Sequence, residues 1–276
     1  MPELPEVETI RRTLNRLVAG KTIESVTVGL PRLIKEPDDS MEFSSRLSGQ
    51  TIHGIGRRGK FLIFELDDDV LVSHLRMEGR YGLYQAGEPV EKHTHVIFHF
   101  TDGTQLRYRD VRTFGTMHLF AKGREESGPP LYKLGPEPLD ASFTAKVLKQ
   151  SMIHRTSKIK PLLLNQEILV GLGNIYVDEA LFRARLHPEK TPEELSDSDW
   201  ERLYHAIVEV LRESISLGGS SIKSYVNGQG ETGQFQHTLQ VYGRKGEPCV
   251  VCGTPIEKSV VGGRGTHICP VCQPRN

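Results

Sequence analysis

All four cysteines of this 276-residue chain lie in its C-terminal segment, at a spacing that suits a single metal ion. Two C-x2-C pairs, separated by residues 253–268, are formed by Cys249, Cys252, Cys269 and Cys272. Each short turn lets two thiolates converge on a tetrahedral ion, and four thiolates close its coordination shell. The spacing therefore predicts one structural Zn²⁺, whose binding supplies folding free energy to a small module, rather than four free thiols.

The N-terminal stretch MPELPEVETIRRTL combines two prolines with acidic residues where a chain normally frays. Pro5 and Glu6 suit the first turn of a helix. Its core face is marked at 3-4-3 spacing by Val7, Ile10, Leu14 and Leu17. Pro2 and Glu3 precede that helix, so a helix start explains most of the stretch but not these two residues.

Two further positions could bind a phosphate group. Arg264 stands among glycines in VVGGRGTH, at the predicted hairpin tip of a basic module that also contains Arg244 and Lys258. Asn174, in the turn VGLGN, is predicted at the start of a helix, where backbone N–H groups favour an anion. From these residues alone, a solvated turn arginine and a simple helix N-cap remain alternatives.

Basic and acidic residues balance at 35 each, but they are unevenly distributed along the chain. Two segments, 105–124 and 145–160, are rich in cations, namely Arg107, Arg109, Arg112, Lys122, Arg124, Lys146, Lys149, Arg155, Lys158 and Lys160. Most of the balancing acids lie between Glu189 and Glu213. The pattern favours a basic face for a polyanion, although two ordinary solvated surfaces would give the same counts.

An apolar content of 37% and a charged content of 25% describe an ordinary globular protein. No apolar run approaches the roughly 18 residues of a membrane span, and the N-terminus lacks the apolar stretch of a signal peptide. We therefore expect a cytoplasmic protein without a membrane segment.

Residues 21–120 have the pattern of antiparallel strands. KFLIFELDDDVLVSHL places two apolar runs around three aspartates, and HVIFHFTDGTQLRYRD alternates around Asp102-Gly103, a strong hairpin signal. Several such strands predict a β-sandwich or a flattened barrel.

The Gly- and Pro-rich residues 121–140 indicate a linker, and helical patterns follow it. Two helices are predicted around the turn VGLGN, and a third over 196–217 with an inward face of Leu203, Ile207, Leu211 and Ile215. Gly218 and Gly219 end that helix, and the glycine-rich stretch up to Phe235 reads as a mobile loop.

Over essentially the whole chain, these motifs resemble one family. MPELPEVETIRR, RRGKF, SHLRMEGRY, RDVRTFGTM, GLGNIYVDEALF, QFQH, VYGR and CVVCGTPIEK…GGRGTHICPVC are similar to bacterial formamidopyrimidine-DNA glycosylases. The resemblance implies an α+β multidomain protein with an N-terminal helix and an antiparallel β-sandwich in a catalytic domain, 1–134. A helix–two-turn–helix domain, 135–238, and a zinc finger, 239–276, would follow.

The resemblance also implies a function. The expected protein is a monomeric base-excision-repair enzyme with one structural Zn²⁺ and no organic cofactor. It would remove 8-oxoguanine and formamidopyrimidines from double-stranded DNA, preferably opposite cytosine, and would then cleave the resulting abasic site.

The resemblance implies catalytic roles for four residues. Removal of Met1 would expose Pro2 as a secondary amine that attacks the sugar C1′ and forms a Schiff base. Glu3 would act as general acid at the sugar ring oxygen. Lys60 would contact phosphate and donate a proton in β-elimination, and Arg264 would hold the lesion phosphate and serve δ-elimination.

The same resemblance implies the DNA contacts. A damaged purine must leave the stack to be reached, and Met77, Arg112 and Phe114 match the residues that fill the gap, with Arg112 facing the orphaned cytosine. From sequence pattern alone, Met77 and Phe114 would be core residues. Further contacts are expected from His74, His93, Arg155, Asn174, Tyr242 and Lys258, and from Ser220 in the loop 218–235 that would close over the flipped base. Thr113 and Asn165 depart from the family pattern at non-catalytic positions.

Three alternatives remain open on the sequence. A DNA-binding zinc protein without catalysis would result if Met1 were retained. A tautomerase could also use an N-terminal proline, although it would need neither a zinc module nor basic segments. An endonuclease VIII-like glycosylase would apply the same chemistry to oxidised pyrimidines.

Overall fold

The computed structural model describes residues 1–220 and 233–275, which divide into two compact units. The first unit contains residues 1–133 together with Gly233, and the second contains residues 134–220 and 234–275. The boundary falls within the predicted linker. Between Ala121 and Ala145 the described backbone is irregular. Residues 221–232, the centre of the loop expected to close over a flipped base, lie outside the described residues.

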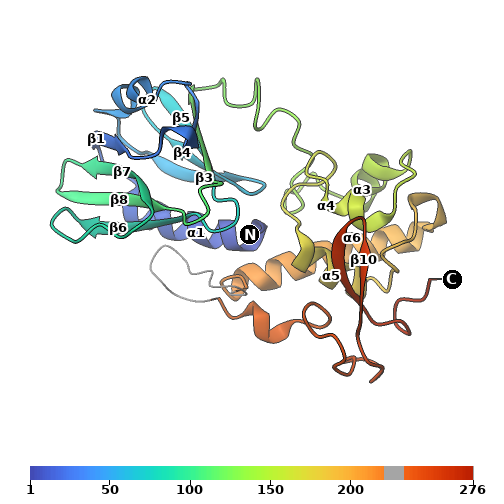
Figure 1. The fold of residues 1–276 in the computed structure, drawn as a ribbon. Coiled ribbons are helices and arrows are strands. Elements are labelled where there is room, and N and C mark those ends of the chain that lie inside the picture. The colour runs from blue at the N-terminus through green and yellow to red at the C-terminus, as the bar shows by residue number, and fades with distance from the viewer. Residues whose placement is uncertain (221–232, 276) are drawn as a thin grey trace. The chain divides into compact units, whose positions relative to one another are not determined.

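The first unit is built on two β-sheets (Figure 1). The four-stranded sheet has the order β1 (Ile23–Val28), β7 (Thr94–Phe100), β8 (Thr104–Arg109), β6 (Arg80–Gln85). The five-stranded sheet has the order β2 (Ile34–Glu36), β9 (Thr116–Ala121), β5 (Asp69–His74), β4 (Phe61–Glu65), β3 (Gly54–Arg58). The predicted sandwich is confirmed, with one correction: β2 pairs with β9 in parallel, whereas every other pair in these two sheets is antiparallel.

The hairpins form where the turn residues predicted them. β7 and β8 are joined through Asp102 and Gly103, and Gly103 adopts a φ of 81°, which glycine accepts without a side-chain clash. β4 and β5 are joined through the run of aspartates, but Asp69 is buried and accepts a hydrogen bond from Gln50. Only part of that acidic run is therefore a solvated turn.

Two helices accompany the sheets. α1 (Leu4–Val18) packs on β3 and buries Val7, Ile10 and Leu14, as its spacing predicts. α2 (Ser40–Leu47) packs on β1, and its first turn is capped by the Asp39 carboxylate, which accepts from the Met41 N–H at 2.7 Å. A short 3-10 turn, Pro31–Leu33, leads into β2. The inner faces of both sheets and both helices share one apolar core.

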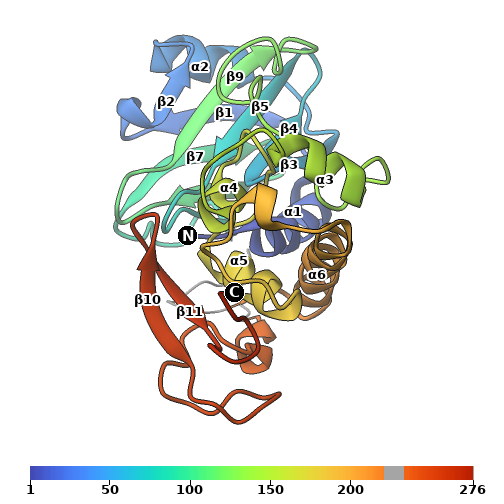
Figure 2. The same ribbon diagram turned by 90° about the vertical axis from the view of Figure 1, so that its right-hand side faces the viewer.

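The second unit contains four helices and a β-hairpin in its described part (Figure 2). The helices are α3 (Ala145–Met152), α4 (Ile159–Leu164), α5 (Asn174–Arg183) and α6 (Asp197–Ser216), with 3-10 turns at Pro192–Glu194 and Phe235–Thr238. β10 (Glu257–Val261) and β11 (Arg264–Ile268) form the hairpin. None of the helices in the described residues combines the length and the apolar character that crossing a bilayer requires.

The longest helix follows its predicted pattern with one shift. Ser196 caps α6, and Leu203, Ile207 and Leu211 are buried as predicted. Ile215 is only half-buried, and the neighbouring Ser214 takes the inward position because its hydroxyl bonds the buried Tyr176 hydroxyl at 2.6 Å. The hydrogen bond between Ser214 and Tyr176 thus takes the place of the last apolar contact predicted for the inward face of α6.

Candidate active site and nucleic-acid interface

The first residues of the chain are held in place rather than frayed. Pro2 is buried and the Glu3 side chain is only 4% exposed. The Glu3 N–H donates to the Glu6 carboxylate at 2.9 Å, and the Val7 N–H donates to the Glu3 carbonyl at 3.0 Å. The residues that a helix start left unexplained therefore have a fixed position at the N-terminus of α1.

A polar network ties α1 to β3. Glu8 accepts from Arg11 and Arg12 along the helix and from the Arg57 Nε at 3.2 Å. Asn15 accepts the Ile55 N–H at 2.8 Å. Burial alone would raise the pKa of Glu8, but the hydrogen bonds from Arg11 and Arg12 bring that pKa below its usual value. The ionised carboxylate thus anchors the helix that begins at Pro2.

Lys60 lies in the tight turn between β3 and β4, where Gly59 has a φ of 54°. Lys60 is only 5% exposed, so it is not an ordinary solvated surface lysine. His74 is close enough for the Lys60 charge to affect it. Burial first, and then the charges of Arg76 and Lys60, lower the pKa of His74 to about 3.

The neutral His74 ring shapes the turn that follows it. Its Nδ1 accepts the Arg76 N–H at 2.9 Å, and its ring meets Phe61 edge-on at a centroid distance of 4.5 Å. Arg76 has a φ of 53°, a left-handed conformation that this hydrogen bond supports. His74 therefore positions the loop that carries Met77.

The three predicted wedge residues are exposed side chains on two loops of the first unit. Met77 is 39% exposed and Phe114 is 53% exposed, so the core alternative for both is wrong. The Arg112 guanidinium lies over the Phe114 ring at 4.9 Å from its centroid. An exposed apolar side chain stacked with an arginine is suited to contact nucleobases.

His93 and Thr113 occupy the same region of the first unit. His93 has a φ of 70°, and its carbonyl accepts the Asp110 N–H at 3.0 Å. Thr113 has a φ of 56°, and its hydroxyl accepts from Arg32. The Thr113 side chain is thus bonded to a cation from a distant part of the chain.

In the second unit, Asn174 and the Arg264 hairpin meet. The Asn174 Nδ2 donates to the Gly265 carbonyl at 2.9 Å, and Gly173, not Asn174, is the N-cap of α5. The N-cap alternative for Asn174 is therefore wrong. Arg264 begins β11 after the turn residues Gly262 and Gly263, with φ of 56° and 74°, and its side chain is exposed as predicted.

A buried ion pair fixes the same hairpin. Lys160 and Asp178 are both fully buried and lie 2.6 Å apart. Lys160 also donates to the Gly265 carbonyl at 3.0 Å and to the Thr266 hydroxyl at 2.8 Å, and the Asp178 carboxylate accepts the His267 N–H at 2.9 Å. The positions of Arg264 and of the N-terminus of α5 are thus coupled through charged groups removed from water.

The next residue of α5 secures the segment before the zinc module. Glu179 is buried and accepts the N–H groups of Gln240, Val241 and Tyr242 at 2.9–3.1 Å. Burial raises the pKa of Glu179 despite these hydrogen bonds. The predicted DNA contact Tyr242 is held in this way, and its ring meets His267 at a centroid distance of 5.1 Å.

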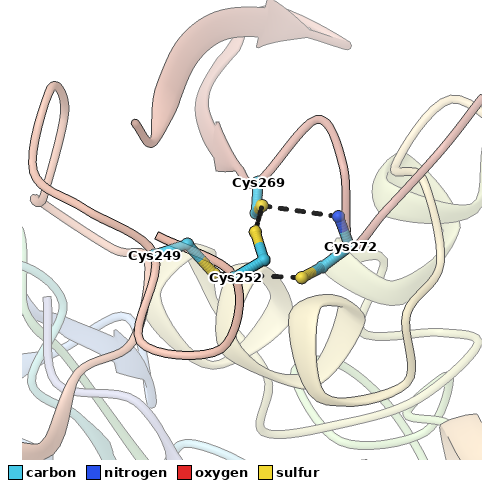
Figure 3. Close-up of side chains that lie close together, drawn as sticks. All are labelled: Cys249, Cys252, Cys269 and Cys272. Atoms are coloured by element: carbon cyan, nitrogen blue, oxygen red, sulfur yellow. Dashed lines mark hydrogen bonds between the residues drawn. The ribbon is translucent and has the colours of Figure 1, made fainter. Parts of the chain in front are cut away.

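The four cysteines converge as their spacing predicts (Figure 3). Their Sγ atoms all lie within 4.8 Å of one another, including 3.4 Å between Cys252 and Cys269 and 3.9 Å between Cys249 and Cys272. Sulfurs bound to one tetrahedral Zn²⁺ lie about 3.8 Å apart, so the cluster fits one structural zinc. Beside the cysteines, Val241 and Ile256 pack with Phe182 of α5, so the module shares a small apolar cluster with the helical unit.

The remaining predicted contacts are dispersed. Arg155 and Lys258 are exposed, whereas Ser220 is buried. The Asn165 side chain accepts the Glu167 N–H at 2.9 Å at the end of α4, a local structural bond.

The expected separation of basic and acidic faces is wrong in part. Arg107 and Lys160 are buried, so neither contributes to a surface. Lys149 pairs with Asp197 at 2.7 Å, and Lys158 pairs with Glu189. Two cations of the basic segment 145–160 are therefore neutralised by acids of the acidic segment.

Sequence reasoning missed the buried charges that position these residues, above all Asp110, Asp178 and Glu179. A sequence feature could have indicated them: in NIYVDEAL, acids stand at positions where the helix pattern predicts apolar residues. A buried acid requires a partner, and these acids bond residues that the motifs had already singled out.

An ordered N-terminal proline and acid on a β-sandwich, with a helical unit that holds a basic four-cysteine hairpin, define a multidomain protein suited to act on nucleic acid. Three family profiles match in order: the formamidopyrimidine-DNA glycosylase N-terminal domain at residues 1–117, its H2TH domain at 134–226, and the zinc finger found in FPG and IleRS at 246–275. The chain belongs to the formamidopyrimidine-DNA glycosylase family.

Individual relatives are similar over their full length. The chain is 66% identical to the formamidopyrimidine-DNA glycosylase of Brevibacillus brevis, covering 99% of both chains. It is 64% identical to that of Halalkalibacterium halodurans, covering 99% of this chain and 100% of the relative. A Lactococcus lactis FPG mutant, solved in complex with DNA containing Fapy-dG, superposes with a TM-score of 0.93 at 46% identity, over 99% of this chain and 100% of that one.

Proposed function

We propose that this protein is a bifunctional DNA glycosylase and abasic-site lyase that removes oxidised purines, 8-oxoguanine and formamidopyrimidines, from duplex DNA. The observation that carries the proposal is the fixed, buried Pro2-Glu3 pair at the start of α1, in a chain whose relatives bear the name of this activity. Chain termini are usually poorly ordered unless they are tied down, and this one is tied down by the bonds around the start of α1.

The chemistry follows from an N-terminal proline. An N-terminal α-amino group has a pKa of about 7.7–8.0, far below that of a lysine, so removal of Met1 would give Pro2 an amine with an unprotonated fraction at neutral pH. Its lone pair bonds to C1′ while the glycosidic bond breaks and its electron pair leaves with the base. The Pro2 nitrogen passes its proton to the departing base. Glu3 then protonates the ring oxygen as the C1′–O4′ bond breaks, which leaves an iminium ion between Pro2 and the opened sugar.

The iminium makes strand cleavage possible. It acidifies the C2′ proton, whose loss expels the 3′ phosphate by β-elimination, and a second proton loss expels the 5′ phosphate by δ-elimination. We assign the proton donation of the first step to Lys60 and the grip on the phosphate in the second to Arg264. The burial of Lys60 supports its role, since a buried amine is pre-positioned, and the exposure of Arg264 on a braced hairpin supports contact with DNA.

The remaining contacts bind and open the duplex. Met77 and Phe114 would enter the stack, and Arg112 would face the orphaned cytosine. The backbone would be held by His74, His93, Arg155, Asn174, Ser220, Tyr242 and Lys258. We place the catalytic domain at 1–134, the helix–two-turn–helix domain at 135–238 and the zinc finger at 239–276. We further propose that the protein is monomeric, cytoplasmic, selective for cytosine opposite the lesion, and free of organic cofactors.

A trapping experiment tests the proposal. Protein shown by mass spectrometry to lack Met1 is incubated with an 8-oxoguanine·cytosine duplex and sodium borohydride, which reduces the iminium to a stable covalent bond. A covalent protein–DNA band is expected, and a preparation that retains Met1 should form none. Absence of the band with the processed protein would leave only a DNA-binding zinc protein.

The alternative substrate class is oxidised pyrimidines. It is favoured by one observation, because a structurally similar Lactococcus lactis Fpg was solved with DNA containing an oxidised pyrimidine. Competition between 8-oxoguanine and thymine glycol duplexes distinguishes the two classes. Preferential cleavage at 8-oxoguanine is expected, whereas preference for the glycol would reassign the substrate.

A further inference from the structure

Two loops of the first unit lie at the same edge of the sandwich. Loop 75–79 connects β5 to β6, and loop 110–115 connects β8 to β9, so each crosses from one sheet to the other. The register makes them neighbours. The last residue of β5 pairs with the first of β9, and the first residue of β6 pairs with the last of β8. The loop that carries Met77 and the loop that carries Arg112 and Phe114 therefore start and end side by side.

The Tyr108 hydroxyl fills the space between these loops. Tyr108 is 1% exposed, and its ring packs on Tyr81 in the core at a centroid distance of 5.0 Å. Gly79 closes the first loop through its N–H to the Leu75 carbonyl at 3.0 Å. A Cβ at Gly79, or one at Gly115 in the second loop, would overlap the Tyr108 hydroxyl. Each loop thus packs against the Tyr108 hydroxyl oxygen at a glycine, because no side chain would fit there.

Asp110 completes the arrangement. Its carboxylate is buried and accepts the Arg112 N–H at 3.1 Å, the Gly115 N–H at 2.8 Å and the Tyr108 hydroxyl at 3.3 Å. Burial, and then the Asp110 charge, raise the pKa of Tyr108, so the hydroxyl remains the donor of this bond. The Asp110 carboxylate therefore fixes the backbone on both sides of Phe114. It also bonds Tyr108, whose hydroxyl contacts Gly79 in loop 75–79.

Both loops contain backbone that needs such support. Arg76 and Thr113, one in each loop, have φ of 53° and 56°, a left-handed conformation that is unfavourable for a non-glycine residue. A strained conformation persists when surrounding bonds over-determine it. The loops are therefore pre-shaped rather than adaptable.

We propose that Tyr108 and Asp110 are positioning residues that fix the two loops as one rigid wedge, so that Met77, Arg112 and Phe114 enter the DNA stack together. This inference rests on the proposed function, since it assigns the wedge to base eversion. Both residues are buried, so they act through the loops rather than at the reacting atoms. A displacement of the wedge would slow eversion of a stacked purine, which needs the gap to be filled as it opens, more than cleavage at an abasic site, which has no base to evert.

Three variants test the proposal. Tyr108→Phe removes only the hydroxyl, and Asp110→Asn removes the charge at constant size. Tyr81→Phe is the matched control, because it also deletes one buried tyrosine hydroxyl, but one that bonds the Ser73 hydroxyl at 2.7 Å rather than Asp110. Each protein is measured on an 8-oxoguanine·cytosine duplex and on a duplex with a preformed abasic site. 2-Aminopurine beside the lesion reports insertion of the wedge by its fluorescence.

Tyr108→Phe and Asp110→Asn should slow 8-oxoguanine excision and the fluorescence change by about tenfold or more, and keep abasic-site cleavage within about twofold of wild type. Tyr81→Phe should leave both activities unchanged. Equal loss of both activities in Tyr108→Phe, or behaviour indistinguishable from Tyr81→Phe, would overturn the positioning role. Failure of wild type to excise the base would instead overturn the proposed function.

Discussion

At the scale of single residues, the acids of the N-terminus have two roles, which their hydrogen-bond partners distinguish. Glu6 and Glu8 bond backbone and arginine groups within the protein, Glu6 to the Glu3 N–H and Glu8 to Arg11 and Arg57. Both bonds fix α1, at whose start Pro2 and Glu3 are assigned to the chemistry. The Glu3 side chain also accepts the Glu6 N–H in the capping box of α1, a bond that a glutamine can keep. Glu3→Gln therefore tests chemistry, whereas substitution of Glu8 tests anchoring.

Glu3→Gln should abolish base excision because the amide cannot deliver a proton to the sugar ring oxygen. Cleavage of a preformed abasic site should survive in part, since the opened aldehyde already presents C1′ to the Pro2 amine. Pro2→Gly should likewise keep some lyase activity through its primary amine. Single-turnover rates on the two duplexes measure both effects, and full excision by Glu3→Gln would refute the assignment.

His74 should make the fold less stable in acid. Its pKa is about 3 in the folded protein against a usual 6.5, so the unfolded chain binds a proton that the folded chain excludes between these values. Stability from this group is complete above pH 6.5 and falls as the pH decreases, by up to about 1.4 kcal/mol per pH unit.

The comparison is with His74→Asn, which retains an acceptor for the Arg76 N–H. Urea unfolding between pH 6.5 and 4 should show a shallower loss of stability for this variant than for wild type. His205→Asn, a change on the exposed face of α6, serves as control and should parallel wild type. Parallel curves for all three proteins would mean that His74 titrates normally.

At the scale of elements, local signals were sufficient for the turns and insufficient for the buried charges. The hairpin at Asp102-Gly103 and the tip at Gly262-Gly263 form where the sequence predicted them, because a turn depends on its own residues. From its sequence context, Lys160 was indistinguishable from the other cations of the basic segment 145–160. Its burial depends on Asp178 and Thr266, which are distant in sequence, and no local pattern contains that information.

The Lys160–Asp178 pair supplies a prediction about the α4–α5–hairpin contact. Lys160→Met should destabilise the protein by about 3–5 kcal/mol, because it leaves the Asp178 charge buried without its cation. Lys158→Met, two residues earlier, removes a surface pair with Glu189 and should cost under about 1 kcal/mol. Thermal unfolding of the two variants measures the difference, and similar melting temperatures would show that the buried pair is not stabilising.

At the scale of the whole molecule, a net charge of zero does not describe the DNA-binding surface. Several cations of the basic segments bond groups within the protein and are not available to DNA. Arg107, for example, donates to the backbone carbonyls of Glu88 and Pro89. The cations expected to meet phosphate are the exposed Arg155, from the basic segment 145–160, and Lys258 and Arg264 of the β10–β11 hairpin. DNA binding then depends on a few cations at fixed positions rather than on an overall excess of positive charge.

This distinction can be measured through the salt dependence of affinity for lesion-containing duplex. With three to four phosphates neutralised, the logarithm of the binding constant should fall with the logarithm of salt concentration with a slope of about −2.7 to −3.6. Arg155→Ala and Lys258→Ala should each reduce that slope by about 1. Lys149→Ala should leave it unchanged, because Lys149 is paired with Asp197. An unchanged slope in the first two variants would remove Arg155 and Lys258 from the interface, whereas a reduced slope in Lys149→Ala would mean that the whole basic segment acts as a diffuse charge.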